Sequence, residues 1–289
     1  MSVFSKQRNN GDPGKRKCMF YWLIALMIVG SSVSGSCLAA DRQNLFDWYY
    51  SAVFGTGAYR IGERDVFVIT LPSEDTWREA TQDKYEVVYS LPVTIGFYDY
   101  NTESIVDLEI PTDVATLIFL PGFYYNIALS ENWSIKPFAN IGYGKEFAGG
   151  EEAWIYSGGV RSLYRIRDDE WRMSLGSALY YAGNTRESKT ALGFAALEVA
   201  LDINHATDWR IDDKNIYLGG YAAVYLFSSL EFVQSDQTTL ELNEQYELGI
   251  TVSTKGNINL LGMELERIGL AYLTSSGFRA WRLVFSFPY

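Results

Sequence analysis

The strongest constraint on the fold is an alternation of large apolar residues with small or polar ones, which recurs in segments of about ten residues separated by turn-forming residues. Because successive residues of a β-strand point to opposite faces, this period of two predicts strands with one apolar face. The segment "EQYELGITVS" shows the pattern, with an apolar face made of Tyr246, Leu248, Ile250 and Val252. Its other face carries Glu247, Gly249 and Thr251.

The same alternation appears in "YEVVYSLPVTIGFY", "NWSIKPFANIGYG" and "EWRMSLGSALYY". Repeated segments of this kind are typical of an outer-membrane barrel, whose wall is apolar toward lipid and polar or small toward the lumen. Beyond the N-terminal region, no stretch approaches the roughly 18 apolar residues of a membrane-spanning helix. The expected fold class is all-β, a transmembrane antiparallel up-and-down β-barrel. A secreted β-sandwich or soluble barrel, whose strands also alternate, is the alternative.

Twelve strands are expected, in keeping with the even number found in single-chain bacterial barrels. The third is short and the ninth is apolar on both faces, so ten or fourteen strands also fit the pattern. The twelve segments are residues 60–71, 84–98, 104–110, 114–129, 132–145, 152–167, 170–182, 189–204, 214–229, 244–254, 259–273 and 278–289.

The expected strand order also assigns each connection to one end of the barrel. If the C-terminus is periplasmic, the turns near Asn132, Asp168 and Gly256 lie at the periplasmic end. The connections at residues 71–84 and 230–243 then lie outside, where loops are longer. Residues 204–213 do not fit this scheme well, because they are long for a periplasmic turn.

The N-terminal region has the features of a secretory leader. Basic residues dominate residues 1–17, and the apolar run "CMFYWLIALMIVG" and the small, polar "SSVSGSCLAA" follow. We therefore expect residues 1–40 to be a signal peptide for export through the Sec pathway, cleaved near Ala39 or Ala40, with the barrel at residues 59–289. Lipid attachment at Cys37 is the alternative, although Ser34 stands where a lipid-attachment box usually has an aliphatic residue.

Cleavage at this point sets the charge and the redox chemistry of the remaining chain. Both cysteines, Cys18 and Cys37, belong to the leader, so no disulfide framework is expected. The remainder carries 19 basic residues against 34 acidic ones. This excess of negative charge argues against binding to nucleic acid or to an anionic membrane surface.

Aromatic residues support the membrane assignment and suggest a family. Tyrosine and tryptophan gather near the expected strand ends, as interfacial girdles do; the examples are Trp133, Tyr143, Trp154, Trp171, Tyr181, Trp281 and Tyr289. The last strand, "GFRAWRLVFSFPY", ends with Phe285, Phe287 and Tyr289 on its apolar face. This ending resembles the C-terminal signal that the barrel assembly machinery reads in outer-membrane proteins.

The length, the twelve expected strands and "WSIKPFANIGYG" are similar to autotransporter translocator barrels. Because few residues precede the first strand, the chain resembles solitary autotransporter-like barrels, which lack a passenger domain. This resemblance implies no catalytic motif. It also implies that a helix can occupy the pore, and the apolar spacing in "DRQNLFDWYYSAV" is helical. Residues 41–58 are therefore expected to form either a luminal helix or a periplasmic lead-in.

The sequence gives little support for an enzyme. Its one histidine, His205, lies at an expected strand end without a serine in the arrangement that an outer-membrane phospholipase needs. Omptin-type proteases need histidine at the extracellular rim, whereas His205 is expected at the periplasmic end. We expect no cofactor, and the absence of paired histidines argues against a metal site.

Strand parity assigns many charged residues to the lumen, because a basic residue facing lipid at mid-depth costs about 2–4 kcal/mol. The basic set is Lys136, Arg161, Arg165, Arg172 and Arg282. The acidic set is Glu86, Asp107, Glu109, Glu198, Asp202, Glu247, Glu264 and Glu266. Across a narrow lumen the two sets pair into a plug, whereas across water they set up a field that orients polar solutes.

Two functions follow from these alternatives. The first is a non-enzymatic outer-membrane barrel with a structural or envelope-interaction role. The second is a narrow passive channel for small polar solutes, and a surface hydrolase is a distant third. The expected partners are outer-membrane lipids, including lipopolysaccharide, and the barrel assembly machinery, with small polar solutes as partners of the channel.

Overall fold

The computed structural model describes residues 55–62, 64–78, 85–98, 116–147, 150–167, 170–186, 192–211, 214–233, 239–260, 263–287 and 289. The expected leader and the segment proposed as a luminal helix or lead-in lie outside the described residues, apart from residues 55–58. Among the residues described, no helix is long and apolar enough to cross a membrane.

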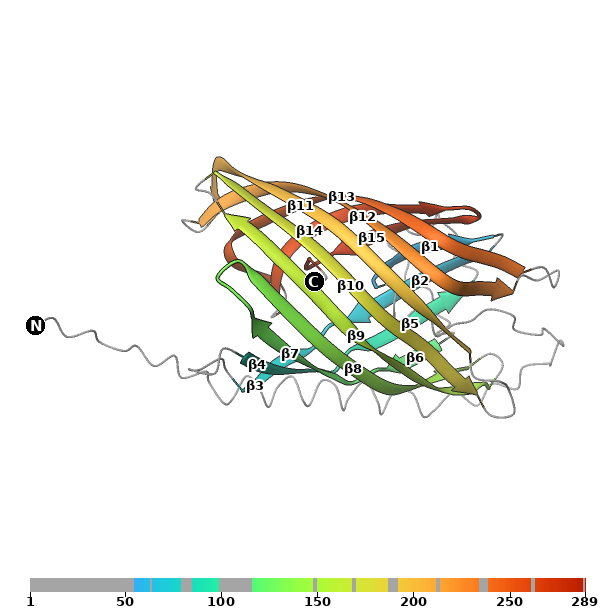
Figure 1. The fold of residues 1–289 in the computed structure, drawn as a ribbon. Coiled ribbons are helices and arrows are strands. Elements are labelled where there is room, and N and C mark those ends of the chain that lie inside the picture. The colour runs from blue at the N-terminus through green and yellow to red at the C-terminus, as the bar shows by residue number, and fades with distance from the viewer. Residues whose placement is uncertain are drawn as a thin grey trace, which may run out of the picture. The chain divides into compact units, whose positions relative to one another are not determined.

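The described chain is built from antiparallel β-strands (Figure 1). The N-terminal strands are short: β1 (Gly57–Ile61), β2 (Arg64–Leu71), β3 (Glu74–Arg78), β4 (Tyr85–Ser90), β5 (Val93–Tyr98), β6 (Thr116–Phe119) and β7 (Gly122–Ala128). Longer strands follow: β8 (Trp133–Glu146), β9 (Glu152–Arg167), β10 (Trp171–Arg186), β11 (Leu192–Ile211), β12 (Lys214–Val233), β13 (Thr239–Leu260) and β14 (Met263–Ser275). The last strand, β15 (Phe278–Val284), is short again.

These strands form one closed barrel of twelve staves, which confirms the expected fold class. The sheet closes because β15 pairs with β1, while β8 pairs with β9 on one side and with β6 and β7 on the other. Three staves are interrupted: β2 continues as β3, β4 as β5, and β6 as β7. Each interruption in these neighbouring staves falls at a Leu-Pro pair, namely Leu71-Pro72, Leu91-Pro92 and Leu120-Pro121.

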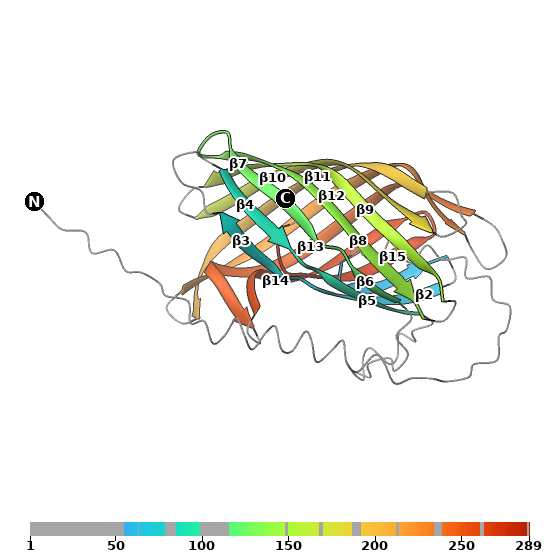
Figure 2. The ribbon, with the colours of Figure 1, turned by 90° about the horizontal axis from the view of Figure 1, so that it is seen from below.

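The Leu-Pro pairs form a row across the wall, which we call the Leu-Pro row. Proline has no backbone N–H, so each one removes a donor from the strand ladder. Bonds between neighbouring breaks partly restore the ladder, since the Leu91 amide donates to Ser73 O at 2.7 Å and the Leu120 amide to Pro92 O at 3.3 Å. The Ile141 amide donates to Pro121 O at 3.0 Å. Figure 2 shows this side of the barrel, where β4 leads into β5 and β7 lies beside β8.

The strand boundaries correct several expectations. The segment expected as one strand at 60–71 contains the turn between β1 and β2, and the short strand expected at 104–110 lies outside the described residues. The connection at 79–84 therefore belongs to the barrel end where β15 finishes, so the expectation that residues 71–84 lie at the opposite end is wrong. Residues 204–211 continue β11 rather than forming a long turn, and Gly256 lies within β13.

The outer face of the wall is apolar, as the alternation predicted. On β13, Leu248 is 66% exposed and Ile250 is 72% exposed, while Glu247 between the strand's outward residues is only 1% exposed. The same alternation holds on β8, β10 and β12. Six of the seven aromatic residues expected in the girdles are exposed: Trp133, Tyr143, Trp154, Trp171, Tyr181 and Trp281.

The inner face of the wall is packed over part of its height. Buried apolar side chains from many strands form one cluster inside the barrel, including Tyr59, Phe194, Leu230, Leu273 and Phe278. Aromatic rings meet edge to face, with the Phe194 and Phe227 centroids 5.7 Å apart. The lumen is therefore partly a hydrophobic core rather than an empty pore.

A charge on the outer face should show how deep each position lies in the membrane. Replacing Leu248 near the middle of β13 with arginine (L248R) should destabilise the folded barrel by about 2–4 kcal/mol, because the charge faces hydrocarbon. The matched change L192R at the end of β11 should cost about 0–1 kcal/mol. Urea unfolding in lipid vesicles, followed by gel mobility, measures both values. Equal costs would contradict the membrane placement of this wall.

Candidate functional site

The inner face of the wall holds a buried ion pair, which we call the central pair. It joins Glu247 on β13 to Arg282 on β15, whose Nη2 lies 2.6 Å from Oε1 and 2.7 Å from Oε2 of the carboxylate. The hydroxyl groups of Tyr221 and Tyr225 on β12 each donate to one oxygen of the same carboxylate. Both charged residues were expected in the lumen, and the structure brings them together.

The surroundings of Glu247 explain how a charge can be held there. Removing a carboxylate from water is costly unless opposite charge and hydrogen bonds compensate for it. Here one guanidinium and two hydroxyl groups donate to the carboxylate, so each oxygen receives at least two hydrogen bonds. Such charge-assisted bonds tie β12, β13 and β15 together inside the barrel.

A second buried pair lies between β11 and β14. The Arg267 guanidinium donates to both oxygens of Asp202, at 2.7 and 3.1 Å, and Asn204 Nδ2 donates to the same carboxylate at 2.7 Å. Asp202 was expected in the lumen, but Arg267 was not. The Arg267 guanidinium also lies 5.5 Å from the centre of the Phe287 ring, within cation–π range.

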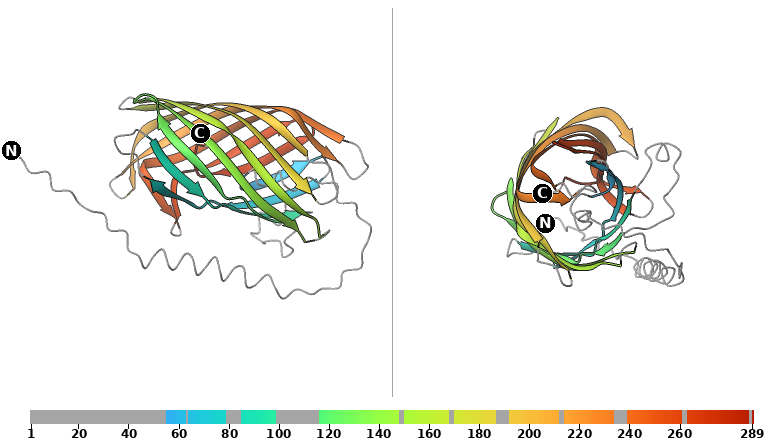
Figure 3. Two further views of the ribbon diagram at one scale, coloured as in Figure 1. Left: turned by 60° about the horizontal axis from the view of Figure 1, so that its bottom comes forward. Right: turned by 90° about the vertical axis from the view of Figure 1, so that its right-hand side faces the viewer.

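The last residues of the sequence turn into the lumen (Figure 3). Strand β15 ends at Val284, and the buried Phe287 ring lies 6.4 Å from that of Tyr221. Tyr289 is only 3% exposed, and its carbonyl oxygen accepts a hydrogen bond from Lys136 Nζ on β8 at 3.2 Å. A Cβ atom at Gly176 on β10 would lie 2.4 Å from the Tyr289 ring. Residues 285–289, here called the tail, thus reach from β15 to the wall formed by β8 and β10.

This tail corrects the expectation that Phe287 and Tyr289 lie on the outer face of a last strand. The period of two continues to Tyr289, but the backbone leaves the sheet after Val284, where the bond from Leu283 N to Thr56 O marks the start of its partner β1. Pro288 cannot donate to a ladder, and the Tyr289 amide instead donates to Phe287 O at 2.9 Å, as in a γ-turn. A role of Phe285, Phe287 and Tyr289 as an assembly signal stays a prediction.

Other predicted lumen residues contact aromatic side chains. Glu198 on β11 accepts a hydrogen bond from the Tyr180 hydroxyl at 2.7 Å. The Arg172 guanidinium lies 3.7 Å from the centre of the Tyr217 ring, and its Nη2 donates to the Tyr217 hydroxyl at 2.8 Å.

On β9, next to β10, the Arg161 guanidinium lies 4.6 Å from the centre of the Phe138 ring. Glu86 on β4 accepts a hydrogen bond from Asn126 Nδ2 at 3.3 Å. The predicted charges are therefore partly neutralised by each other and partly held by aromatic and amide groups.

The other charged residues predicted to line the lumen are not among the buried contacts described above. Asp107 and Glu109 lie outside the described residues, as does the side chain of Glu264, while Glu266 is exposed and Arg165 is half-buried. The expectation for Glu266 is wrong because the inward positions of β14 are the odd ones, where Leu265 and Leu273 are buried. The small residues Gly269 and Ala271, which share the inward face with Arg267, were the available signal.

His205 does not contribute to the lumen. It is exposed, and its ring packs edge-on against Trp171 at 4.4 Å. Its neighbour Asn204 faces inward, so His205 lies on the outer face of β11. Within the described part of the chain, no cluster of three or more histidine, cysteine, aspartate or glutamate side chains could hold a metal ion.

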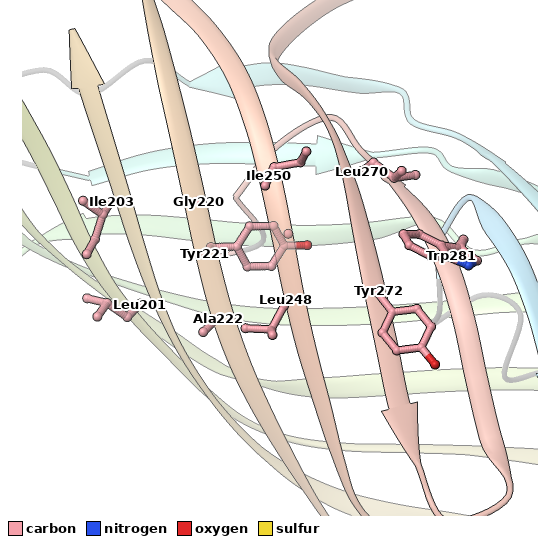
Figure 4. Close-up of a pocket in the computed structure, with 11 residues that line it drawn as sticks. Leu201, Ile203, Gly220, Tyr221, Ala222, Leu248, Ile250, Leu270, Tyr272 and Trp281 are labelled. Atoms are coloured by element: carbon pink, nitrogen blue, oxygen red, sulfur yellow. The ribbon is translucent and has the colours of Figure 1, made fainter.

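The outer wall carries a shallow groove of about 480 Å³ (Figure 4). Small residues hollow the surface between larger side chains, and the lining is almost wholly apolar. It comprises Leu201, Ile203, Gly220, Tyr221, Ala222, Leu248, Gly249, Ile250, Leu270, Tyr272 and Trp281, from strands β11 to β15. This groove matches the hydrocarbon that surrounds a barrel in a membrane.

A second hollow of about 170 Å³ lies inside the barrel, and we call it the luminal cavity. One part of its lining is apolar, with Leu120, Phe138, Phe194, Phe227 and Leu273 among its residues. The other part contains Arg161, Glu198, Gln245 and Arg282, together with Asn140 and Ser157. This mixed lining distinguishes the luminal cavity from the groove on the outer wall.

A closed barrel of twelve antiparallel strands with an apolar outer face and charged groups inside is an integral outer-membrane β-barrel. No family model matches the sequence, and no curated protein matches it. The structure is similar to the β domain of the Bordetella autotransporter Brka, with 10% identity, a TM-score of 0.46, and coverage of 80% of this chain and 96% of that one.

Two further solved structures are similar. The translocator domain of autotransporter NalP from Neisseria meningitidis has 9% identity and a TM-score of 0.47, covering 78% of this chain and 83% of its own. LpxR from Salmonella typhimurium has 10% identity and a TM-score of 0.42, covering 79% of this chain and 90% of its own. At these identities the likeness concerns the arrangement of strands.

Breaking the central pair should destabilise the barrel strongly. The variant E247Q leaves Arg282 buried without its counter-charge and should cost about 3–5 kcal/mol. Changing both partners, in E247Q/R282Q, should cost less than the sum of the two single changes, because neither charge is then left unpaired. Urea unfolding in vesicles gives the three values. Additive effects would show that the pair contributes no coupling.

The packing of the tail can be tested through Gly176. In a background in which Cys18 and Cys37 are serine, a cysteine at position 289 (Y289C) should react slowly with a polar maleimide, because Tyr289 is buried. Adding G176V should raise the labelling rate at least about tenfold, since the new side chain occupies the place of the tail. Mass spectrometry measures the rates, with G220V on β12 as the control, because a Cβ atom there would make only an ordinary contact of 3.6 Å. Fast labelling without G176V would contradict a buried tail.

Proposed function

We propose that this protein is a non-conducting, non-enzymatic outer-membrane barrel of the autotransporter-like type, with a structural or envelope-interaction role. The observation that supports the proposal is the burial of the central pair and the tail inside the barrel, where Glu247 is 1% and Tyr289 3% exposed. Conduction requires a continuous polar path, and packed aromatic side chains and buried ion pairs oppose the entry of water and ions. The paired state of the luminal carboxylates also leaves little scope for acid–base chemistry.

In this proposal the partners are outer-membrane lipids, lipopolysaccharide included, and the barrel assembly machinery. Phe285, Phe287 and Tyr289 act as the assembly signal while the chain is still unfolded. The tail turns into the lumen only when β15 pairs with β1. The assembly machinery thus recognises these residues before the tail enters the lumen, so one segment can serve both roles.

A narrow channel for small polar solutes is the second candidate. It is favoured by the luminal cavity, whose lining includes the opposite charges Arg161 and Glu198. Such a channel needs the tail to leave the lumen, at least transiently. The two candidates therefore differ in a property that can be measured directly.

Single-channel recording in a planar bilayer distinguishes them, after gel mobility has shown that the barrel is folded. The intact protein should give no stable ohmic steps. Deleting residues 285–289 and replacing both partners of the central pair with serine should produce steps, because this removes the obstruction. A steady pore in the intact protein, with a reversal potential altered by R161E, would instead establish the channel.

A further inference from the structure

The luminal cavity lies inside the barrel, between residues of β8 to β15. Its volume is about 170 Å³. Apolar cavities of about 150 Å³ are known to accept a benzene molecule. The available space therefore suits one ring that carries a small substituent, and it is too small for a sugar chain or a lipid.

The apolar part of the lining suits an aromatic ring. Phe138, Phe194 and Phe227 contribute rings from β8, β11 and β12, and Tyr180 packs against two of them, with centroid distances of 6.3 Å to Phe138 and 6.4 Å to Phe194. Rings in such clusters prefer tilted or edge-to-face contacts, which a further ring can extend. A single aromatic ring is thus the apolar group that best fits this lining.

The polar part of the lining contains donors that a ligand can use. Glu198 already accepts a hydrogen bond from Tyr180. By contrast, Gln245 is only 2% exposed, and its Nε2 has no hydrogen-bond partner among the described residues. An amide donor buried without a partner is unfavourable, and a ligand that carries an acceptor can satisfy it.

Arg161 supplies positive charge to the same cavity. Its guanidinium lies over the Phe138 ring, and within the described parts of the chain it forms no salt bridge. The other cavity arginine, Arg282, is already engaged by Glu247. Guanidinium groups bind carboxylates with two parallel hydrogen bonds. The group that fits the free donors is therefore an anion, and a planar carboxylate fits them best.

We propose that the luminal cavity binds one single-ring aromatic carboxylate, with its ring among Phe138, Phe194 and Phe227 and its carboxylate at Arg161, and with Gln245 as a second donor. This binding goes beyond the proposed function, because it requires neither conduction nor catalysis. The two proposals can therefore fail separately. A barrel that does not conduct could lack the binding site, and a barrel that conducts could have it.

Isothermal titration calorimetry of the folded, detergent-solubilised full chain with sodium benzoate tests the proposal. The protein should bind benzoate and should bind benzylamine at least about tenfold more weakly, because the ammonium group faces Arg161. No heat from benzoate, or equal affinity for the two compounds, would overturn the assignment. Folding of every variant is checked first by its heat-modifiable gel mobility.

Three substitutions locate the site. R161Q should weaken benzoate binding at least about tenfold and Q245L about two- to tenfold, in line with the loss of a charged and a neutral hydrogen bond. E198Q should strengthen binding, since it removes a negative charge from the lining. The matched control R165Q, on the same strand but outside the cavity lining, should leave affinity unchanged. Equal affinities of R161Q and R165Q would refute the proposal.

Discussion

The pairing of β1 with β15 is the interaction on which the rest of the structure depends. A wall surrounded by hydrocarbon must satisfy every backbone donor and acceptor within itself, so a sheet in a membrane has to close. In the closed sheet, β15 pairs with β1 from Phe278 to Arg282 and with β14 as far as Val284. One further backbone bond, from Arg267 N to Phe285 O at 3.2 Å, follows, and the chain then leaves the sheet. The inward tail begins where these pairings end.

Part of the lumen is then filled by side chains of the tail, which do not belong to the strands of the wall. The tail brings two aromatic side chains to the buried pairs, and Phe287 lies near both Tyr221 of the central network and Arg267 of the second pair. Lys136 holds the far end of the tail through its bond to Tyr289. The tail, which belongs to none of the strands, thus lies close to charged residues of several strands. These strands are β8, β11, β13, β14 and β15.

Alternation along the chain was enough to predict the barrel, the outward face of β13 and the inward position of Glu247 and Arg282. It could not predict which charges would pair, because partners such as Asp202 and Arg267 come from strands that are not adjacent. Arg267 was missed because the even positions of β14 were expected to face the lumen, whereas the buried residues Leu265 and Leu273 occupy odd positions. The direction of Phe287 and Tyr289 was also hidden, because it depends on where β1 begins rather than on the local pattern.

The Leu-Pro row gives the barrel two unequal halves. Strands β9 to β13 are each 16–22 residues long and uninterrupted by proline, whereas the staves from β2 to β7 are each divided into pieces of 4–8 residues. Long antiparallel ladders of neighbouring strands form from local hairpins, and loop closure between them is inexpensive. The long half can therefore exist as a curved, half-formed sheet before the short half joins it. The three divided staves should then be the last strands to join the sheet during folding. They should also be the first to separate from it under stress.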